Sequence, residues 1–583
     1  MTPAIITFAA SGQAVAQRIA ALTGGDVLPA DKALPAQLFA EGRPLVGVCA
    51  AGILIRLLAP LLADKHAEPP VLAVSADGAH VVPLLGGHHG ANRLAREIAE
   101  GLGAVAALTT ASDARFAFGL DEPPGGYRLA DPAAAKPAMA AVLAGAAITL
   151  DGEAPWLEAA GYPISPEGTL HVAVTERRAA AADLVYHPQV LVAGLGCERG
   201  TPAEEVIGLV EETLATAGLA AESLAALGSI DLKADEAALH AAARHFGVPL
   251  RLFSAAELAE ERDRLPNPSA LVEAEVGTPG VAEAVALKAG TLLVPKRKAR
   301  RATCAIGRAA APLSAERFGR APGQLHVVGV GPGEARSRTS AAVAALAASS
   351  DWVGYGLYLD LVADLRRGQH EHRFPLGDEE ARVRHALELA GTGRTVALVC
   401  SGDGQIYAMA ALVYELLAAE GPRAVSDAAR RVAVESHPGI SAFQVASARA
   451  GALIGHDFCC ISLSDLLTPR EDIVRRLEAA ARADFVTAFY NPRSLRRTDL
   501  IERAHAIFSA HRPPETPVLV GSNLGRPEEK LRVTTIAAFD PRDVDMLTIV
   551  LFGASTSRAF RRGDGAMAAF TPRGYERKAG EAP

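Results

Sequence analysis

Residues 325–333 read LHVVGVGPG, and the second half of the chain is organised around this stretch. Its apolar first part predicts a short buried strand, and its glycines and proline predict a tight turn directly after that strand. Glycine lacks a Cβ atom, so a turn of this kind lets the backbone approach a ligand closely. Residues 337–348 then have the composition of a helix, with Ser337, Thr339 and Ser340 as candidates for its N-cap.

One glycine turn leaves other interpretations open. An ordinary βα turn has the same composition, and a nicotinamide dinucleotide fold also begins with a glycine-rich turn. The spacing here is G-x-G-P-G rather than G-x-G-x-x-G. A dinucleotide fold also needs an acid after its second strand, whereas Asp351 precedes the predicted strand 352–355 and Gly356 follows it. These two mismatches disfavour the dinucleotide fold.

Three more loops of similar character follow predicted strands. Strand 395–400 leads into SGDGQIYAMA (401–410), strand 432–435 into HPGISAFQVASARAG (437–451), and strand 484–489 into YNPRSLRRTDL (490–500). Further strands are predicted at 518–521 and 547–552, and no regular structure is predicted after Phe560. Strands therefore alternate with helices, and in open α/β sheets ligands bind at the carboxyl ends of the strands. The four loops together predict one ligand site.

The overall composition limits the classes of function. The chain has 583 residues and a charged fraction of 21%, which fits soluble globular domains. Its net charge of −8 gives no general attraction for nucleic acid or acidic membranes. Its six cysteines form no C-x-x-C pair, so the sequence indicates neither a zinc site nor a disulfide framework. The N-terminus lacks the pattern of a secretory signal, and no apolar run is long enough for a membrane span. We therefore expect a cytoplasmic protein with no membrane partner and no metal.

The first half begins with a strand at 4–9, a helix at 13–22 and a strand at 45–49. The apolar helical stretch 50–65 carries Arg56 and ends at Lys65, and residues 71–85 predict a hairpin around Asp77-Gly78. A lone arginine on an apolar face usually extends to water, but it can also hold a carboxylate.

The stretch LLGGHHGAN (84–92) then places His88 and His89 among glycines before a helix at 92–101. Adjacent histidines do not point the same way, which disfavours a two-histidine metal site. The loop suits an anionic or keto ligand, or it is a plain turn with exposed histidines.

The middle of the chain is less informative. Residues 121–170 are rich in Pro, Gly and Ala and predict a small, less regular region. A strand at 190–193 leads into GLGCERGTPAEEV (194–206), with Thr201 as the predicted N-cap and Glu204 in the capping-box position. A helix is predicted at 235–246 and a strand at 248–253, while the basic run 296–301 (KRKARR) is interpreted as a solvated face. Residues 309–324 are the best candidate for a domain boundary.

The second half, over about residues 323–560, resembles the tetrapyrrole methyltransferases of corrin biosynthesis. The stretches GVGPG (329–333), GHDFCCISLSDLLTPRE (455–471), AFYNPRSLRR (488–497) and DMLTIVLFGAST (545–556) are similar to the precorrin-3B C17-methyltransferase branch in particular. The resemblance implies a fold of two α/β domains with a cleft between them. It also implies S-adenosylmethionine as cofactor, a precorrin or corrinoid tetrapyrrole as substrate, and C17 methylation with ring contraction to precorrin-4.

The resemblance implies a set of site residues. Cofactor contacts are expected from Pro332, Ser401, Gly402, Asp403, Ile406, Ser441, Ala442 and Asn491. Asp403, His437 and Tyr355 are candidates for acid–base chemistry, and Gly331, Arg493, Arg496 and Arg497 for substrate contacts; the three arginines can equally well solvate a helix start. The usual G-D-P turn reads Gly402-Asp403-Gly404 here, and Gly356 stands where sibling enzymes have an aspartate, so no acid–base role is carried over to that position.

The first half, over about residues 3–308, resembles the cobalt-precorrin-5A hydrolase family. The similarity lies in GILIRLLAPLLADK (52–65), LLGGHHGAN, GLGCERGTPAEEV and SIDLKADEAAL (229–239). That family is thought to open a lactone on the macrocycle. Candidate residues are His88 and His89 as general bases, and Arg56, Lys65, Lys233 and Glu236 around the substrate. The alternative is a binding module without turnover.

The sequence therefore predicts an α/β multidomain protein of fused corrin-pathway modules. The expected parts are a hydrolase-like domain at 1–120, a small middle region at 121–187, a second hydrolase-like α/β domain at 188–310 and a linker at 311–323. A methyltransferase N-lobe at 324–431, a C-lobe at 432–560 and a tail at 561–583 follow. Family members are commonly homodimers. The competing interpretation is a corrinoid-binding carrier or scaffold whose methyltransferase fold has lost turnover, and Gly404 is the feature that raises it.

Overall fold

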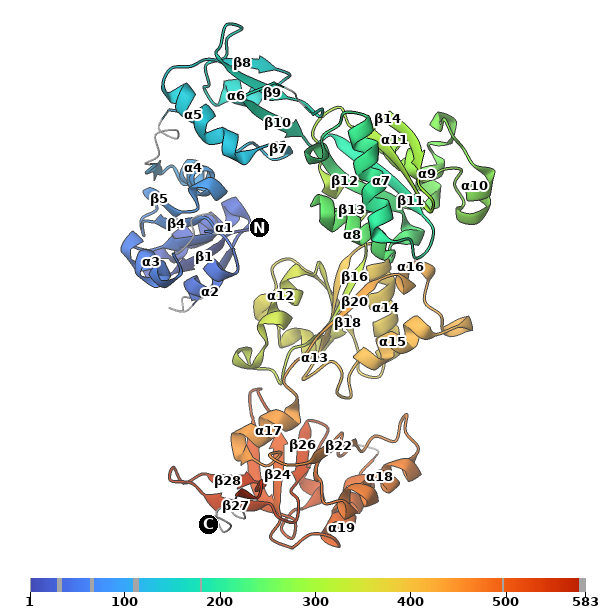
Figure 1. Cartoon of the computed structure of the whole chain (residues 1–583). Coiled ribbons are helices and arrows are strands. Elements are labelled where there is room, and N and C mark those ends of the chain that lie inside the picture. The colour runs from blue at the N-terminus through green and yellow to red at the C-terminus, as the bar shows by residue number, and fades with distance from the viewer. Residues whose placement is uncertain are drawn as a thin grey trace, which may run out of the picture. The chain divides into compact units, whose positions relative to one another are not determined.

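A computed structural model describes residues 2–28, 34–62, 68–108, 115–178, 181–494 and 497–575 (Figure 1). The chain divides into two compact units, Met1–Ala321 and Pro322–Pro583, which we describe separately as the first and second units. The predicted linker at 311–323 contains this division.

The first unit begins with a six-stranded sheet of order β2-β1-β3-β4-β5-β6. Its strands are β1 (Ala4–Thr7), β2 (Asp26–Leu28), β3 (Leu45–Val48), β4 (Val71–Val74), β5 (His80–Leu85) and β6 (Val105–Ala106). Helices α1 (Gln13–Thr23) and α4 (Ala91–Leu102) pack on one face, and α2 (Leu34–Ala40) and α3 (Ala51–Leu58) pack on the other. The predicted hairpin is confirmed, because β4 and β5 pair antiparallel across the turn that contains Gly78.

The middle region is more regular than predicted. Strands β7 (Tyr127–Leu129), β8 (Ile148–Asp151), β9 (Leu170–Val174) and β10 (Leu184–Pro188) form a sheet of order β7-β10-β9-β8, accompanied by α5 (Ala135–Leu143) and α6 (Pro155–Ala159). Its core is aromatic: Phe116 stacks on Tyr162 with ring centroids 4.2 Å apart, and Trp156 meets Tyr186 edge-on at 5.0 Å. Aromatic side chains bury large areas, so a few of them order a segment that is otherwise rich in Pro, Gly and Ala.

The third sheet of the first unit has the order β13-β12-β11-β15-β14. Its strands are β11 (Leu191–Cys197), β12 (Leu224–Ile230), β13 (Leu250–Phe253), β14 (Thr291–Lys298) and β15 (Ala302–Arg308). Its helices are α7 (Ala203–Thr216), α8 (Ala237–Phe246), α9 (Ala255–Ala259), α10 (Ala270–Val276) and α11 (Ala282–Ala289). The predicted basic run 296–301 lies at the end of β14 and in the turn to β15.

The predicted N-cap at Thr201 is wrong. Helix α7 begins after Pro202, and the Thr201 hydroxyl instead donates to the carbonyl of Glu198 at 2.9 Å. The proline explains the difference, because its restricted φ suits the residue that immediately precedes a helix. Glu204 therefore lies in the first turn of α7 without the capping box that the sequence suggested.

The second unit starts with a fully parallel sheet of order β18-β17-β19-β16-β20. Its strands are β16 (Gln324–Gly329), β17 (Asp351–Tyr355), β18 (His370–Phe374), β19 (Thr395–Cys400) and β20 (Ala433–His437). Its helices are α12 (Ser340–Ala348), α13 (Gly356–Asp360), α14 (Glu379–Gly391), α15 (Ala410–Ala418) and α16 (Asp427–Arg430). Helices α12 and α13 pack on one face, and α14, α15 and α16 pack on the other. Of the three predicted cap candidates, Thr339 is the N-cap of α12, accepting from the amide of Ala342 at 3.2 Å.

The second lobe of this unit contains a mixed sheet of order β22-β23-β26-β24-β25. Its strands are β22 (Phe458–Ser462), β23 (Val486–Tyr490), β24 (Pro517–Ser522), β25 (Lys530–Thr535) and β26 (Thr548–Phe552). Helices α18 (Arg470–Arg482) and α19 (Asp499–Ser509) pack on one face, and α17 (Ala442–Ala450) packs on the other.

The expectation of no regular structure after Phe560 is wrong. Strand β27 (Arg558–Arg561) runs into β28 (Met567–Phe570), which pairs antiparallel with β27 and parallel with the short β21 (Gly451–Ala452). Ala569 is fully buried in this small sheet. The partner strand β21 lies more than a hundred residues earlier in the chain, so no local pattern indicated the pairing. Within the described ranges, no helix is long and apolar enough to cross a membrane.

Candidate functional site

The glycine turns after β16 and β19 are joined directly by backbone hydrogen bonds. The amide of Gly331 donates to the carbonyl of Gly402 at 3.1 Å, and the amide of Gly402 donates to the carbonyl of Gly331 at 2.7 Å. Both glycines have positive φ values, +74° and +67°, which a residue with a side chain rarely adopts. The predicted substrate residue Gly331 and the predicted cofactor residue Gly402 thus hold the two loops together.

A third turn, after β20, packs against the same place through Gly439. A Cβ atom on Gly439 would lie 2.1 Å from the carbonyl oxygen of Gly402 and 2.5 Å from that of Gly329. Such separations are far inside van der Waals contact, so only glycine fits. The turns after three strands of one sheet therefore meet in a surface made of backbone atoms. We call this surface the glycine cradle (Gly329, Gly331, Gly402 and Gly439).

The side chain of Asp403 connects two of the turns that form the cradle. One carboxylate oxygen accepts from the amide of Gly439 at 3.1 Å, and the other accepts from the amide of Gln405 at 2.8 Å. Hydrogen bonds from backbone amides to an ionised carboxylate are stronger than neutral ones. The carboxylate of Asp403 is therefore engaged in positioning two loops.

The loop after Asp403 reaches the second lobe. The Tyr407 hydroxyl donates to the carbonyl of Cys460 at 2.8 Å, and its ring lies 5.1 Å from the ring of Tyr490. Ile406 packs with Ala442 and Tyr490 against the core beneath α17. The predicted cofactor residues Ile406 and Ala442 thus pack against the same apolar core.

Tyr490 carries an unusual hydroxyl. It lies near Ser441 and the backbone of Phe443, yet it has no hydrogen bond of good geometry among the described residues, although the oxygen is buried. Burial raises the pKa of Tyr490, so the hydroxyl keeps its proton and can donate it. A buried polar group without a partner is costly, which makes this hydroxyl a candidate contact for a bound ligand.

Two further predicted cofactor residues, Ser441 and Asn491, lie near Tyr490. Ser441 is 2% exposed and begins α17, where Gln444 accepts from its amide at 3.0 Å. Asn491 follows β23 with a φ of +50°, and its side-chain amide donates to the Ser462 hydroxyl at 3.1 Å. Asparagine tolerates the left-handed conformation better than most residues, which explains its use at this sharp turn.

Arg526 is a candidate site residue that sequence reasoning missed. Its Nε donates to the carbonyl of Pro332 at 3.2 Å, and its Nη2 donates to the Ser401 hydroxyl at 3.2 Å. It lies in the turn after β24. Burial raises the pKa of Tyr358, and the positive charge of Arg526 partly offsets this rise. A Gly-Arg-Pro sequence directly after a buried strand was the available signal.

An ion-pair cluster joins the same loops across the two lobes. Arg449 of α17 contacts Glu334, with Nη2 and Oε1 2.6 Å apart, and also contacts Glu529. Glu529 in turn accepts from the amide of Gly525 at 2.7 Å. These contacts hold the turn that carries Arg526 against the Pro332 loop.

Other predicted residues of the second unit lie outside the cradle. The His437 side chain contacts His326, with Nε2 and Nδ1 2.9 Å apart, and Tyr355 packs edge-on against Tyr358 at 5.2 Å. Arg493 donates to the carbonyl of Pro541 at 3.1 Å. Arg497 is buried and donates to Ser464 and to the carbonyl of Asn491, both at 3.1 Å, so it supports the turn. Arg496 lies outside the described residues.

In the first sheet of the first unit, His89 lines a hollow of about 810 Å³ together with Arg93, Glu97 and Glu68. His89 Nδ1 lies 2.6 Å from the carbonyl of Glu68, which leaves its Nε2 for a ligand. Arg56 is exposed on α3. Lys65 and the side chain of His88 lie outside the described part of the chain.

At the carboxyl ends of β11 and β12, Glu236 is 4% exposed and accepts from the amide of Gly200 at 3.0 Å. Arg199 forms an ion pair with Asp235, with Nη1 and Oδ1 2.5 Å apart. Arg301 forms one with Glu198, with Nε and Oε2 3.1 Å apart. Burial raises the pKa of Cys197 to about 11, so this thiol stays protonated. Lys233 follows β12 at the same edge. We call this group the charged rim.

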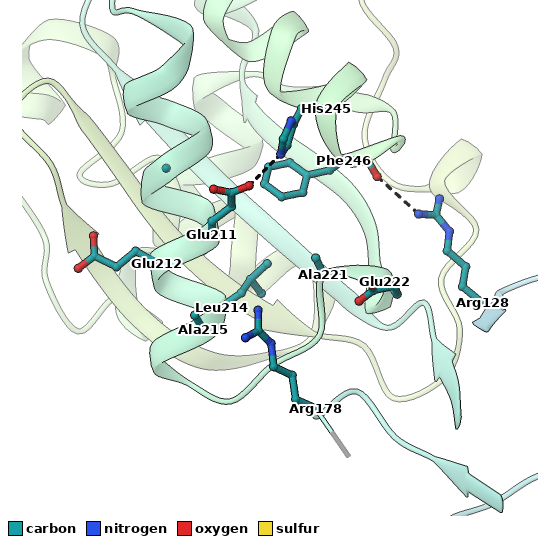
Figure 2. Close-up of a pocket in the computed structure, with 11 residues that line it drawn as sticks. Arg128, Arg178, Glu211, Glu212, Leu214, Ala215, Ala221, Glu222, His245 and Phe246 are labelled. Carbon is teal, nitrogen blue, oxygen red and sulfur yellow. Dashed lines mark hydrogen bonds and ion pairs between the residues drawn. The ribbon is translucent and has the colours of Figure 1, made fainter. Parts of the chain in front are cut away.

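A further pocket of about 710 Å³ lies in the first unit between β7 and helices α7 and α8 (Figure 2). His245 contacts Glu211 at 2.9 Å, and Arg128 donates to the carbonyl of Gly247 at 2.9 Å. None of the residues that the sequence singled out lines it, and it is not at a strand carboxyl end. It therefore contributes nothing to the candidate sites above.

The second-unit site fits a cofactor that lies against the packed turns, because the amides of Gly331, Gly402 and Gly439 are already bonded within the protein. The cradle has no room for side chains at Gly329 and Gly439, its carbonyls and amides are close-packed, and the buried Tyr490 hydroxyl needs a partner. The adjacent Ile406 and Ala442 supply partly buried apolar side chains.

The sequence matches three protein families. Residues 33–113 match the family described as Cobalamin synthesis G N-terminal, and residues 191–307 match Cobalamin synthesis G C-terminus. Residues 324–540 match Tetrapyrrole (Corrin/Porphyrin) Methylases.

Individual relatives match the second unit. A Probable cobalt-factor III C(17)-methyltransferase of Salmonella typhimurium is 41% identical over 251 residues, which are 43% of this chain and 99% of the relative. A Precorrin-3B C(17)-methyltransferase of a Sinorhizobium species is 38% identical over 253 residues, 43% of this chain and 97% of the relative.

Other relatives are longer, and the matched segment spans about half of their length. For a Cobalt-factor III methyltransferase of Priestia megaterium, identity is 40% over 256 residues, 44% of this chain and 46% of the relative. Through its second unit, the chain belongs to the cobalt-factor III and precorrin-3B C17-methyltransferases of the tetrapyrrole methylase family, here joined to Cobalamin synthesis G domains.

Proposed function

We propose that the second unit methylates C17 of precorrin-3B or its cobalt form, with ring contraction to the precorrin-4 level, and that S-adenosylmethionine is the methyl donor. The glycine cradle carries this proposal. Backbone atoms of Gly329, Gly402 and Gly439 meet at the carboxyl edge of a parallel sheet, where α/β proteins bind ligands.

The chemistry of the donor agrees with the surface. S-adenosylmethionine supplies a methyl group on a positively charged sulfonium, which is stabilised by carbonyl oxygens and repelled by cations. In the cradle, the Asp403 carboxylate holds the amides of Gly439 and Gln405 and keeps the turns in place. The Tyr490 hydroxyl and the apolar side chains of Ile406 and Ala442 bind and orient the rest of the molecule. Orientation of this kind accounts for much of the rate of a group transfer.

The tetrapyrrole carries several carboxylates and needs cationic contacts. Arg526 places a guanidinium beside the cradle, because it bonds to both Pro332 and Ser401. These two hydrogen bonds leave other N–H groups of the Arg526 guanidinium for a substrate carboxylate. Arg493 is a second candidate at the turn after β23. For the proton movements of ring contraction we retain Asp403, His437 and Tyr355 as candidates.

The test is conversion of precorrin-3B by the purified full-length chain with S-adenosylmethionine, followed by mass spectrometry and absorption spectroscopy. We expect addition of one methyl group and the spectrum of a contracted ring. Tight binding of both molecules without a methylated product would favour a carrier instead. Light scattering of the same preparation checks the homodimer that we propose by analogy.

For the first unit we propose a lactone hydrolase acting on a later corrinoid intermediate. The supporting observation is the hollow that His89 lines with Arg93, which places a general base beside a cation. His89→Ala in the full-length chain should abolish lactone opening and leave methyl transfer unchanged. Lactone opening that survives in this variant would contradict the assignment to His89.

A further inference from the structure

We propose that His326, Glu435 and His437 form a binding site for a divalent transition-metal ion of the zinc type. The three residues lie on β16 and β20, the latter an edge strand of the parallel sheet. The sequence offers no hint of the site, because the two histidines are 111 residues apart.

The register of the sheet places the three side chains together. His326 is the partner of Glu435 across the parallel pair, and His437 is the partner of Val328. Residues two apart on a strand point to the same face, so His326, Glu435 and His437 all project from one side. Val328 packs in one core cluster with Ala342, Ala345 and Leu346 of α12, which identifies that side of the sheet.

The distances fit one metal ion. His326 Nδ1 lies 2.9 Å from His437 Nε2, and Glu435 Oε2 lies 3.8 and 3.9 Å from these two atoms. A point equidistant from three atoms so spaced is about 2.1 Å from each, which is the length of a zinc–nitrogen or zinc–oxygen bond. The three atoms therefore converge on a single position at coordination distance.

Burial and charge also suit an ion. The side chains of His326 and His437 are 7% and 11% exposed, whereas that of Glu435 is 60% exposed. The two imidazoles form the inner wall and the carboxylate lies on the solvent side, so an ion can enter from solvent. The carboxylate neutralises one of the two positive charges of the ion. Imidazole with carboxylate is a donor set that zinc accepts, with further positions for water.

A second histidine pair, between strand β18 and helix α14, shows what a non-convergent arrangement looks like. His372 Nδ1 lies 3.0 Å from His385 Nε2, but the carboxylate of Asp351 contacts the opposite ring nitrogen of His372, at 2.9 Å. The three groups form a chain of hydrogen bonds, and no single position lies within coordination distance of all of them. This pair is a matched control for the proposed site.

Metal binding would secure the cradle. His437 is the last residue of β20, and Pro438 and Gly439 follow directly. An ion bridging β16 and β20 would hold the carboxyl end of the edge strand in register. The proposal does not depend on methyl transfer, because its measurements are metal binding and backbone protection.

The experiment uses full-length protein freed of metal with a chelator and titrated with Zn²⁺, and with Co²⁺ for its absorption spectrum. We expect one more bound equivalent in the wild type than in His437→Ala, and affinity at that site weaker by at least about 100-fold in the variant, since loss of a ligand exceeds the effect of outer-shell changes. Glu435→Gln, at an exposed position that does not endanger folding, should weaken binding in the same direction. His385→Ala should bind as the wild type does.

Hydrogen exchange provides the second measurement. Zn²⁺ should slow exchange of the amides of residues 433–437 and of Gly439 in the wild type and not in His437→Ala. No bound metal in the wild type, or equal binding by the wild type, Glu435→Gln and His437→Ala, would overturn the proposal. In that case the two histidines are a hydrogen-bonded pair only.

Discussion

The glycine cradle and the charged rim occupy the same place in two different sheets, yet they are built differently. Each lies at the carboxyl ends of parallel strands, β16, β19 and β20 in one case and β11 and β12 in the other. The cradle consists of backbone atoms packed so closely that Gly439 has no room for a Cβ. In the rim, charged side chains pair with each other, as Arg199 does with Asp235.

The difference shows that the same edge of a sheet can be built from backbone atoms in one place and from paired side chains in another. We therefore expect the two edges to suit different ligands. A backbone surface presents oriented carbonyls and amides and suits a compact, positively charged donor. A rim of paired charges is already satisfied internally, so an anionic ligand must displace existing partners. Four substitutions test this contrast.

The largest effect is expected from Gly439→Ala. The new methyl group would collide with the carbonyls of Gly402 and Gly329, and overpacking of this kind costs about 1–3 kcal/mol of stability. We expect loss of S-adenosylmethionine binding in calorimetric titration and a lower unfolding temperature. Gly563→Ala is the control, because a Cβ there meets open space. Wild-type affinity in Gly439→Ala would show that the cradle is not the cofactor site.

Asp403→Ala should have the next largest effect. It removes the acceptor for the amides of Gly439 and Gln405. If cofactor binding loses the equivalent of one hydrogen bond to a charged group, about 1.5–3 kcal/mol, affinity for S-adenosylmethionine should fall by about 10- to 100-fold. Calorimetry measures the change and circular dichroism confirms folding. Asp564→Ala removes a similar carboxylate–amide bond, to Ala566, in another turn and should bind normally. Equal affinities in the two variants would remove Asp403 from the site.

Arg526→Ala distinguishes an effect on tetrapyrrole binding from an effect on cofactor binding. If the guanidinium holds a tetrapyrrole carboxylate, KM for the tetrapyrrole should rise by about 10-fold, the value of one charge-assisted contact, while affinity for S-adenosylmethionine changes little. Steady-state kinetics with each ligand varied in turn measures both. Arg532→Ala, which breaks an exposed pair with Asp543, is the control. Weaker cofactor binding with an unchanged tetrapyrrole KM would make Arg526 only a tie between loops.

Glu236→Gln addresses the charged rim and should have the smallest effect. Glutamine keeps an oxygen acceptor for the Gly200 amide but loses the charge, so we expect a loss of about 1 kcal/mol in the stability of the first unit. Denaturant unfolding followed by fluorescence measures it, and S-adenosylmethionine affinity should be unchanged. A change in cofactor affinity would show that the rim and the cradle are coupled.

Much of the fold was predictable because its signals are local. The structure has β19 at Thr395–Cys400, the range predicted from its apolar run, and the helix after it begins beyond the glycine loop as expected. Strand β28 was missed because its pairing with β21 is remote in sequence and its four residues carry little pattern of their own. Arg526 was missed for the same reason: its importance depends on contact with Pro332 and Ser401, not on its neighbours in the chain.

By itself, the sequence determined the order of strands, glycine turns and helices in the second unit, and its resemblance to known families. Short apolar runs and glycines act on the backbone within a few residues, so they can be recognised without a structure. Only the tertiary structure decided that Gly439 meets Gly329 and Gly402, that Asp403 holds their loops, and that His326 and His437 face one another. These contacts arise from the register between strands far apart in the chain, which depends on the packing of the whole sheet.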